Sequence, residues 1–345
     1  MGGMAKQKII ARIEGEPGDR VPVIPQITYG AASIIGRTVQ ELSGKSELMV
    51  GALSRAHAEA GYDAIYAGWE SSFNAMAEAM GCRMSITEGG LPSVTEGVIK
   101  EPGDISRLEP PDPEVAPTLR PRLETIDLLR ERLGPDVLIL SYIPGPFTLA
   151  GLLCGVDRLM MAVIQDPGFV GDVGSAAADA VVPFIRATAA RGADVLVVAD
   201  PSASSSLISP EHFSQFAGPY IGRLMGEISR AGALPSLHIC GNTAPILEQM
   251  ADTGPKVLEL DHLVDLGEAM SRVGDRVCLQ GNVDPVKVLR LGSADEVRGT
   301  ARVCLEAAGG RRFILSSGCE VPDGTPVANL RAMVEARDAF RGGST

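Results

Sequence analysis

Eight short runs of apolar, mostly β-branched residues alternate along this chain with longer stretches of helical periodicity. The runs cover residues 21–27, 63–67, 137–142, 194–199, 234–239, 257–260, 276–280 and 312–316. Several of them, such as 195–199, are apolar at every position, as strands covered on both faces are. This alternation is typical of parallel β/α units, and eight such units close into a barrel. The sequence therefore predicts an α/β fold, a (β/α)8 TIM barrel.

Helices are expected between these strands, and one connection is too long for a plain loop. The helices are predicted at 46–60, 119–133, 166–191, 210–231, 244–253, 263–273, 294–308 and 326–341. Residues 84–117 are rich in Gly, Pro and Glu, so we expect an insertion with its own hairpin between strands 2 and 3, covering one barrel end. The 345 residues would suffice for two average domains, but α/β barrels use this length as one. We expect a single domain over residues 1–345.

Charge and hydropathy restrict the partners and the compartment. The formal net charge of -12 repels nucleic acids and anionic membrane surfaces at long range, so neither is an expected partner. The first residues lack the apolar core of a signal peptide, and no run approaches the roughly 18 apolar residues of a membrane span. The six cysteines show no disulfide framework, so we expect thiols or metal ligands in a reducing compartment. A cytoplasmic protein is predicted.

Two soft metal ligands stand two residues apart at the end of the fifth predicted strand. In an extended strand His238 and Cys240 point to the same face, so both can bind one metal ion. Cys319 follows the eighth strand and would complete a Cys2His set, one ligand short of a closed tetrahedron, as in catalytic zinc sites. The alternative for the pair alone is a buried thiol beside a core histidine. The third thiol at the same barrel rim favours metal binding.

Other side chains at the carboxyl ends of the predicted strands would face the same rim. Asp261 is a labile fourth ligand, an acceptor that fixes the His238 tautomer, or the N-cap of the next helix. Glu70 is an acid, base or acceptor in the cavity, or a solvated loop carboxylate. These two carboxylates are the candidate catalytic residues. The candidate cofactor-contacting residues, expected to wall the pocket or orient a ligand, are Tyr29, Trp69, Gln280 and Asn282.

Five motifs resemble the uroporphyrinogen decarboxylase superfamily over nearly the whole chain. They are Gly-Pro-Phe-Thr-Leu-Ala at 145–150, Gly-Ala-Asp at 192–194 with Asp200, Ser-Pro-Glu-His-Phe at 209–213, His-Ile-Cys-Gly-Asn at 238–242 and Leu-Gln-Gly-Asn-Val-Asp-Pro at 279–285. Within that superfamily, the His-x-Cys pair and the later Gly-Cys before a Thr-Pro helix start resemble the zinc-dependent corrinoid methyltransferases. Methylcobamide:coenzyme M methyltransferases typify this branch, which is a barrel.

The resemblance implies methyl transfer between a corrinoid such as methylcobalamin, on a separate carrier protein, and a zinc-activated thiol or related small substrate. Zinc would lower the pKa of the thiol, and the thiolate would take the methyl group from Co(III) and leave Co(I). The reverse direction uses the same site. The alternatives are a uroporphyrinogen decarboxylase and a non-catalytic corrinoid-binding barrel. Decarboxylases carry Arg-Gln-Ala-Gly-Arg where this chain has Pro-Gln-Ile-Thr-Tyr-Gly at 25–30, and a catalytic Asp where it has Gly-Trp-Glu-Ser at 68–71.

Overall fold

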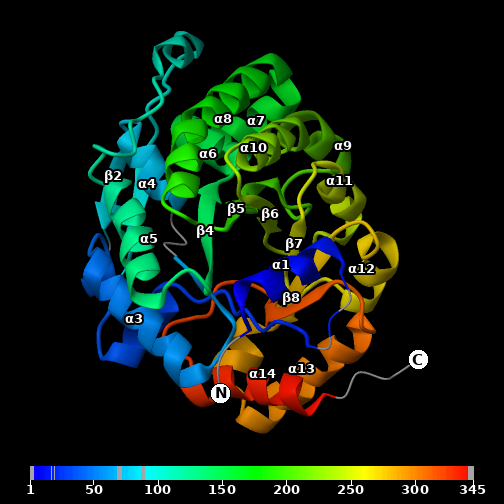
Figure 1. The fold of residues 1–345 in the computed structure, drawn as a ribbon. Coiled ribbons are helices and arrows are strands. Elements are labelled where there is room, and N and C mark those ends of the chain that lie inside the picture. Colours follow the sequence, from blue (N-terminus) through cyan, green and yellow to red (C-terminus); the bar gives the residue numbers. More distant parts are fainter. Residues whose placement is uncertain (1–3, 17, 19, 68–71, 87–89, 341–345) are drawn as a thin grey trace.

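Seven parallel strands form one curled sheet in the computed structural model, which describes residues 4–16, 18, 20–67, 72–86 and 90–340 (Figure 1). In hydrogen-bonded order they are β1 (Ala64–Tyr66), β4 (Leu138–Pro144), β5 (Val195–Ala199), β6 (Leu234–Ile239), β7 (Val257–Leu260), β8 (Cys278–Val283) and β9 (Phe313–Ser317). The strands are buried along almost their whole length. The predicted α/β class is confirmed, and each strand overlaps one of the predicted runs.

The first predicted strand, residues 21–27, is not a strand in the structure, although it lies between the two edges of the sheet. Val23 forms an isolated parallel bridge with Leu315 of β9. On its other side, the Val23 carbonyl accepts a 2.8 Å hydrogen bond from the N–H of Asp63, the residue before β1. Pro22 and Pro25 have no N–H to donate, so a continuous ladder cannot form here. The sheet in the described part of the chain therefore has one strand fewer than predicted.

Helices surround the sheet (Figure 1). They are α1 (Lys6–Glu14), α2 (Val39–Leu42), α3 (Ser46–Ala60), α4 (Ser72–Ala79), α5 (Arg120–Leu133), α6 (Pro146–Cys154), α7 (Val156–Gln165), α8 (Pro167–Ala190), α9 (Pro210–His212), α10 (Gly218–Arg230), α11 (Leu247–Asp252), α12 (Leu266–Val273), α13 (Ala294–Ala308) and α14 (Val327–Ala339). Short 3-10 helices include η1 (Tyr29–Ile35) and η2 (Pro102–Arg107), and π-helices cover η4 (Phe213–Ala217) and η6 (Pro285–Arg290).

Two helix predictions agree with the structure at both ends. The bounds of α3 and α13 equal the predicted ranges 46–60 and 294–308, and a Ser293 capping box starts α13. The predicted helix at 210–231 is interrupted by the π-helix η4. The sequence reasoning missed α6, which is buried at nearly every position and so has no polar face to give a helical period.

Alternate residues of the strands belong to two separate apolar layers. In β4, Ile139 and Ile143 pack with the outer helices, whereas Leu138 and Leu140 pack inside the sheet with Ile9 of α1. Lys6 and Arg12 bond to carbonyls of Asp136 and Gly310, which precede β4 and β9. Helix α1 therefore closes the end of the sheet where the strands begin, and the opposite end is left for the site.

The region predicted as an insertion, residues 84–117, contains a separate antiparallel pair. Strands β2 (Arg83–Ile86) and β3 (Pro92–Glu96) pair with each other and not with the main sheet. The chain then docks on α6, because the N–H of Ile99 donates to the Leu153 carbonyl at 2.8 Å. The pair stands between β1 and β4 in the chain.

By length and composition, one helix among the described residues, α8, is long and apolar enough to cross a membrane. A second would count only if α6 and α7, bent by 106° at their junction, were taken as one span. In the structure 56% of the apolar window of α8 is buried against neighbouring elements. Such burial is usual for a core helix.

Candidate metal centre

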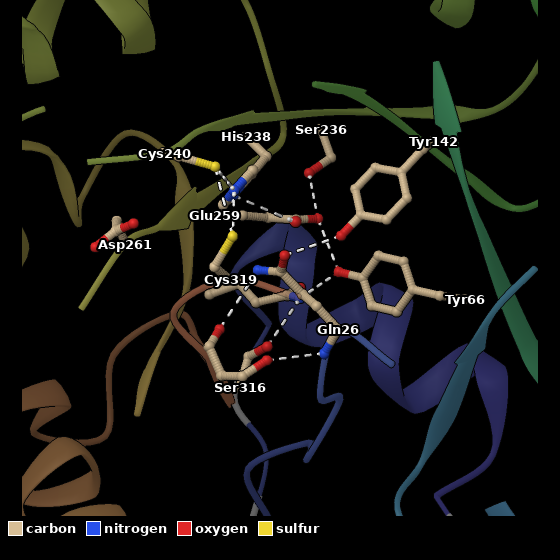
Figure 2. A network of polar contacts seen from close by, with 12 residues as sticks. Gln26, Tyr66, Tyr142, Ser236, His238, Cys240, Glu259, Asp261, Ser316 and Cys319 are labelled. Carbon is tan, nitrogen blue, oxygen red and sulfur yellow. Dashed lines mark hydrogen bonds and ion pairs between the residues drawn. The ribbon is translucent and has the colours of Figure 1, made fainter. Parts of the chain in front are cut away.

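His238, Cys240 and Cys319 come together at the carboxyl ends of β6 and β9 (Figure 2). His238 Nε2 lies 3.0 Å from Cys240 Sγ and 3.8 Å from Cys319 Sγ, and the two sulfur atoms are 3.5 Å apart. Within the described residues, this is the group of three His, Cys, Asp or Glu side chains whose ligand atoms lie close enough to hold one metal ion. The three side chains predicted as ligands are therefore neighbours in space.

The spacing of these atoms is close to that of a zinc site, although the 3.0 Å separation of His238 Nε2 and Cys240 Sγ is shorter than a tetrahedral edge. With Zn–S bonds of about 2.3 Å and Zn–N bonds of about 2.0 Å, a tetrahedron has edges of roughly 3.5–3.8 Å. The observed separations are 3.0, 3.5 and 3.8 Å. One nitrogen and two sulfur donors on a partly buried rim form the ligand type that zinc prefers, with a fourth position open.

The protons of the cluster are shared among its members. Burial lowers the pKa of His238, but contact with Cys319 and two nearby carboxylates outweighs burial and raises it to about 9. The hydrogen bond with Cys319 lowers the pKa of Cys240, and the same contact, together with burial, raises the pKa of Cys319. These shifts favour protons on His238 and Cys319 over a proton on Cys240. Metal binding would displace these protons, because ligating thiols and imidazole bind without them.

Glu259 of β7 lies beside His238 in the β6–β7 ladder and was missed by the sequence reasoning. Its side chain is fully buried, and Oε1 accepts hydrogen bonds from Tyr66 Oη at 2.9 Å and Ser236 Oγ at 3.1 Å (Figure 2). Its Oε2 lies 3.9 Å from His238 Nδ1. Burial raises the pKa of Glu259. The available signal was a lone acid inside the apolar run Val-Leu-Glu-Leu at 257–260, since buried charges need partners.

Gln280, predicted to orient a ligand, belongs to the same buried network. Its Nε2 donates to Tyr66 Oη at 2.6 Å and contacts Ser316 Oγ at 3.4 Å. Tyr142 Oη donates to Gln26 Oε1 at 2.9 Å, and the Tyr66 and Tyr142 rings stack with centroids 5.2 Å apart. Together these side chains form one buried network of polar contacts (Figure 2).

Asp261 and Asn282 fix the loops beside the ligands. Asp261 Oδ2 accepts from the N–H of Gly241 at 2.9 Å, and Oδ1 accepts from the N–H of Leu263 at 2.9 Å. The His262 ring also contacts Oδ1, with Nδ1 at 2.9 Å. These are contacts with loop backbone and not those of a helix N-cap, because the N-cap of the next helix, α12, is Asp265. Figure 2 shows Asp261 to one side of the three ligands. Asn282 Nδ2 donates to the carbonyls of Asp261 at 3.0 Å and Val264 at 2.7 Å, so both of its amide hydrogens are used.

Tyr29 is not part of this cluster. Tyr29 begins η1 and lines a cavity of about 160 Å³ together with Asn74, Glu78 and Arg122. Trp69 and Glu70 lie outside the described residues.

Asp200 anchors the start of α6. Its carboxylate accepts from the N–H groups of Phe147 at 3.1 Å and Thr148 at 2.7 Å, and from Thr148 Oγ1 at 2.7 Å. Burial raises the pKa of Asp200 to about 6 despite these hydrogen bonds. A Cβ on Gly145 would lie 2.3 Å from the Asp200 Cβ, so glycine is required where the two strand ends approach.

Gly318 sets the position of Cys319, and replacing it by alanine is expected to disturb the cluster. A Cβ there would meet the His262 backbone nitrogen at 2.4 Å. Since backbone cannot move aside cheaply, we expect Gly318→Ala to lose about 1–3 kcal/mol of stability and to bind zinc more weakly. Thermal unfolding and a zinc titration check this. Gly299→Ala in α13 is the control, because its Cβ meets nothing within 4 Å; a Gly318 variant that behaves like this control would contradict the expectation.

Fold and site together define an α/β protein of barrel type with a candidate metal centre at the carboxyl ends of its parallel strands. The chain belongs to the uroporphyrinogen decarboxylase (URO-D) family, whose sequence profile matches residues 4–340. The superfamily resemblance drawn from the motifs is confirmed. Membership does not select the reaction, because one fold hosts several chemistries.

Relatives that match nearly the whole chain are named as methyltransferases. The methylcobamide:CoM methyltransferase MtaA of Methanosarcina barkeri is 31% identical over 340 residues, 97% of this chain and 98% of its own length. The Methylated-thiol--coenzyme M methyltransferase of Methanosarcina mazei is 29% identical over 333 residues, 96% of this chain and 88% of its own length. A solved structure of a methyltransferase from Methanosarcina mazei has a TM-score of 0.88 and 31% identity, covering 97% of this chain and 98% of that chain.

A relative with the other reaction matches a smaller part of the chain. The uroporphyrinogen decarboxylase of Methylococcus capsulatus is 32% identical over 274 residues, 76% of this chain and 76% of its own length. Coverage therefore favours the methyltransferase branch, while the percentage identities are nearly equal.

Proposed function

We propose that this protein is a zinc-dependent methyltransferase that moves a methyl group between a corrinoid and a small thiol or related substrate. The observation that carries the proposal is the His238, Cys240 and Cys319 donor set, in a chain that matches methylcobamide methyltransferases from end to end. We further propose a single barrel domain, a corrinoid held on a separate carrier protein, and a cytoplasmic location.

The chemistry follows from the open position of the donor set. A bound Zn2+ would lower the pKa of a substrate thiol and supply a thiolate at neutral pH. Methyl transfer forms the C–S bond and breaks the Co–C bond, whose electron pair stays on cobalt, while the thiol proton goes to solvent. His238, Cys240 and Cys319 hold and orient the site, and Asp261 keeps the turn after Cys240 in place through the Gly241 N–H.

Decarboxylation of a porphyrinogen is the competing function, and the site residues argue against it. A substrate with many carboxylates needs cations to compensate its charge, and residues 25–30 supply none. Gln26 from that segment is instead buried against Tyr142 and Ser317. A non-catalytic corrinoid-binding barrel would not need three converging soft ligands.

The proposal predicts that zinc-loaded protein demethylates methylcobalamin when a suitable thiol is added. Protein purified without chelators is expected to hold about one zinc per chain, as one three-ligand site requires. A panel of thiols, including coenzyme M, is screened for the spectral change from methylcobalamin to Co(I). Protein treated with a chelator is the control, and adding zinc back is expected to restore the rate. Protein that turns over uroporphyrinogen, or that stays inactive with every thiol while loaded with zinc, would contradict this proposal.

A further inference from the structure

The two nitrogens of His238 face different partners. Nε2 points at the two sulfur atoms, at 3.0 and 3.8 Å. Nδ1 is buried without a hydrogen-bond partner among the described residues and lies 3.9 Å from Glu259 Oε2, which is also buried without one. A neutral imidazole that donates the Nε2 lone pair to a metal carries its proton on Nδ1, so that nitrogen needs an acceptor.

Glu259 is fixed in a way that leaves one oxygen for this purpose. Its Oε1 is occupied by Tyr66 Oη and Ser236 Oγ, at 2.9 and 3.1 Å. His238 and Glu259 are also register partners in the parallel ladder between β6 and β7, so the sheet itself holds them side by side. A fully buried carboxylate costs several kcal/mol unless it is compensated, which makes its position beside a histidine functionally informative.

We infer that Glu259 is the positioning residue of the metal centre, and that it sets the His238 tautomer and ring orientation by accepting the Nδ1–H. The inference rests on the proposed function, because it concerns His238 as a metal ligand. It gives Glu259 the role that the sequence offered as one alternative for Asp261, whose oxygens are engaged by the backbone N–H groups of Gly241 and Leu263.

Glu259→Gln tests this role with little change in shape. The glutamine oxygen keeps the bonds from Tyr66 and Ser236, and its NH2 group faces His238 Nδ1. A donor there favours the tautomer with the proton on Nε2, the atom that the metal needs. We expect zinc affinity to fall about 10- to 100-fold, as for other acceptors behind a ligating histidine. Glu259→Asp retains a carboxylate and is expected to recover part of the affinity.

The control is Tyr142→Phe, which removes one hydrogen bond from the same buried network without touching Glu259 or His238. It is expected to bind zinc about as tightly as the wild type, far from the roughly 10-fold loss that marks an acceptor behind a ligating histidine. Affinities are measured by competition with a chromophoric chelator, and melting temperatures are measured on chelator-treated protein. Because glutamine keeps the shape of Glu259 and the two hydrogen bonds at its Oε1 position, Glu259→Gln is expected to melt close to the wild type.

The outcomes distinguish the positioning role of Glu259 from the proposed function of the protein. Weaker zinc binding by Glu259→Gln with an unchanged or higher melting temperature supports the positioning role. Wild-type affinity in this variant overturns the positioning role and leaves the proposed function standing. The positioning role is also overturned if chelator-treated Glu259→Gln melts well below the wild type. It is overturned as well if Tyr142→Phe loses zinc affinity by the same factor. Wild-type protein that binds no zinc overturns both the positioning role and the proposed function.

Discussion

Cys319→Ala is expected to lose zinc and to abolish methyl transfer. The variant keeps only His238 and Cys240, two ligands from one short segment, and loses the thiol that follows β9. A four-ligand zinc site is worth about 10–16 kcal/mol, or roughly 2.5–4 kcal/mol per ligand, so zinc affinity should fall about a hundredfold or more. Zinc per chain is measured after dialysis, and methylcobalamin demethylation is measured in parallel.

Cys154→Ala is the matched control for the loss of a cysteine. Cys154 is a buried free thiol at the end of α6 and is not one of the three clustered side chains. We expect this variant to keep zinc and activity, apart from a small loss of stability from the missing sulfur. Full zinc content in Cys319→Ala, or an equal loss in the control, would show that the cluster is not the metal site.

The parallel strands could be predicted because burial on both faces leaves continuous apolar runs in the sequence. That signal failed at residues 21–27, where the run is equally apolar but Pro22 and Pro25 prevent a ladder. Helix α6 was not predicted for a different reason. It is buried on almost every side, and this removes the polar face on which helical periodicity depends. Apolar runs thus reveal burial more reliably than they reveal hydrogen bonding.

The convergence of the ligands could be predicted because the carboxyl ends of barrel strands share one rim, whatever their separation in sequence. The side chains around the ligands could not be predicted, since their partners depend on strand register and packing. Asn282 was expected to face a ligand, yet its amide hydrogens bond the carbonyls of Asp261 and Val264. Glu259 was overlooked because its partner His238 lies on the neighbouring strand β6.

A buried ion pair holds residues 21–27, where the first strand was predicted. Arg337 of α14 and Asp63 are both nearly inaccessible to solvent, with Nη1 and Oδ2 2.7 Å apart. Asp63 also accepts from the N–H groups of Val23 at 2.7 Å and Met4 at 2.8 Å, and Arg337 Nη1 donates to the Val21 carbonyl at 3.0 Å. These contacts do what a strand ladder would do, because they join residues 21–27 to β1 and to α14.

Arg337→Met is therefore expected to cause a large loss of stability, about 3–5 kcal/mol, because it leaves the Asp63 carboxylate buried and uncompensated. Urea and thermal unfolding measure the loss. Arg298→Met in α13 is the control, since its ion pairs with Asp295 and Glu335 are exposed and little change is expected. Adding Asp63→Asn to Arg337→Met removes the unpaired charge and should recover part of the stability. If Arg337→Met unfolds like the control, backbone hydrogen bonds and apolar packing hold residues 21–27 in place, and the ion pair contributes nothing to closing the sheet.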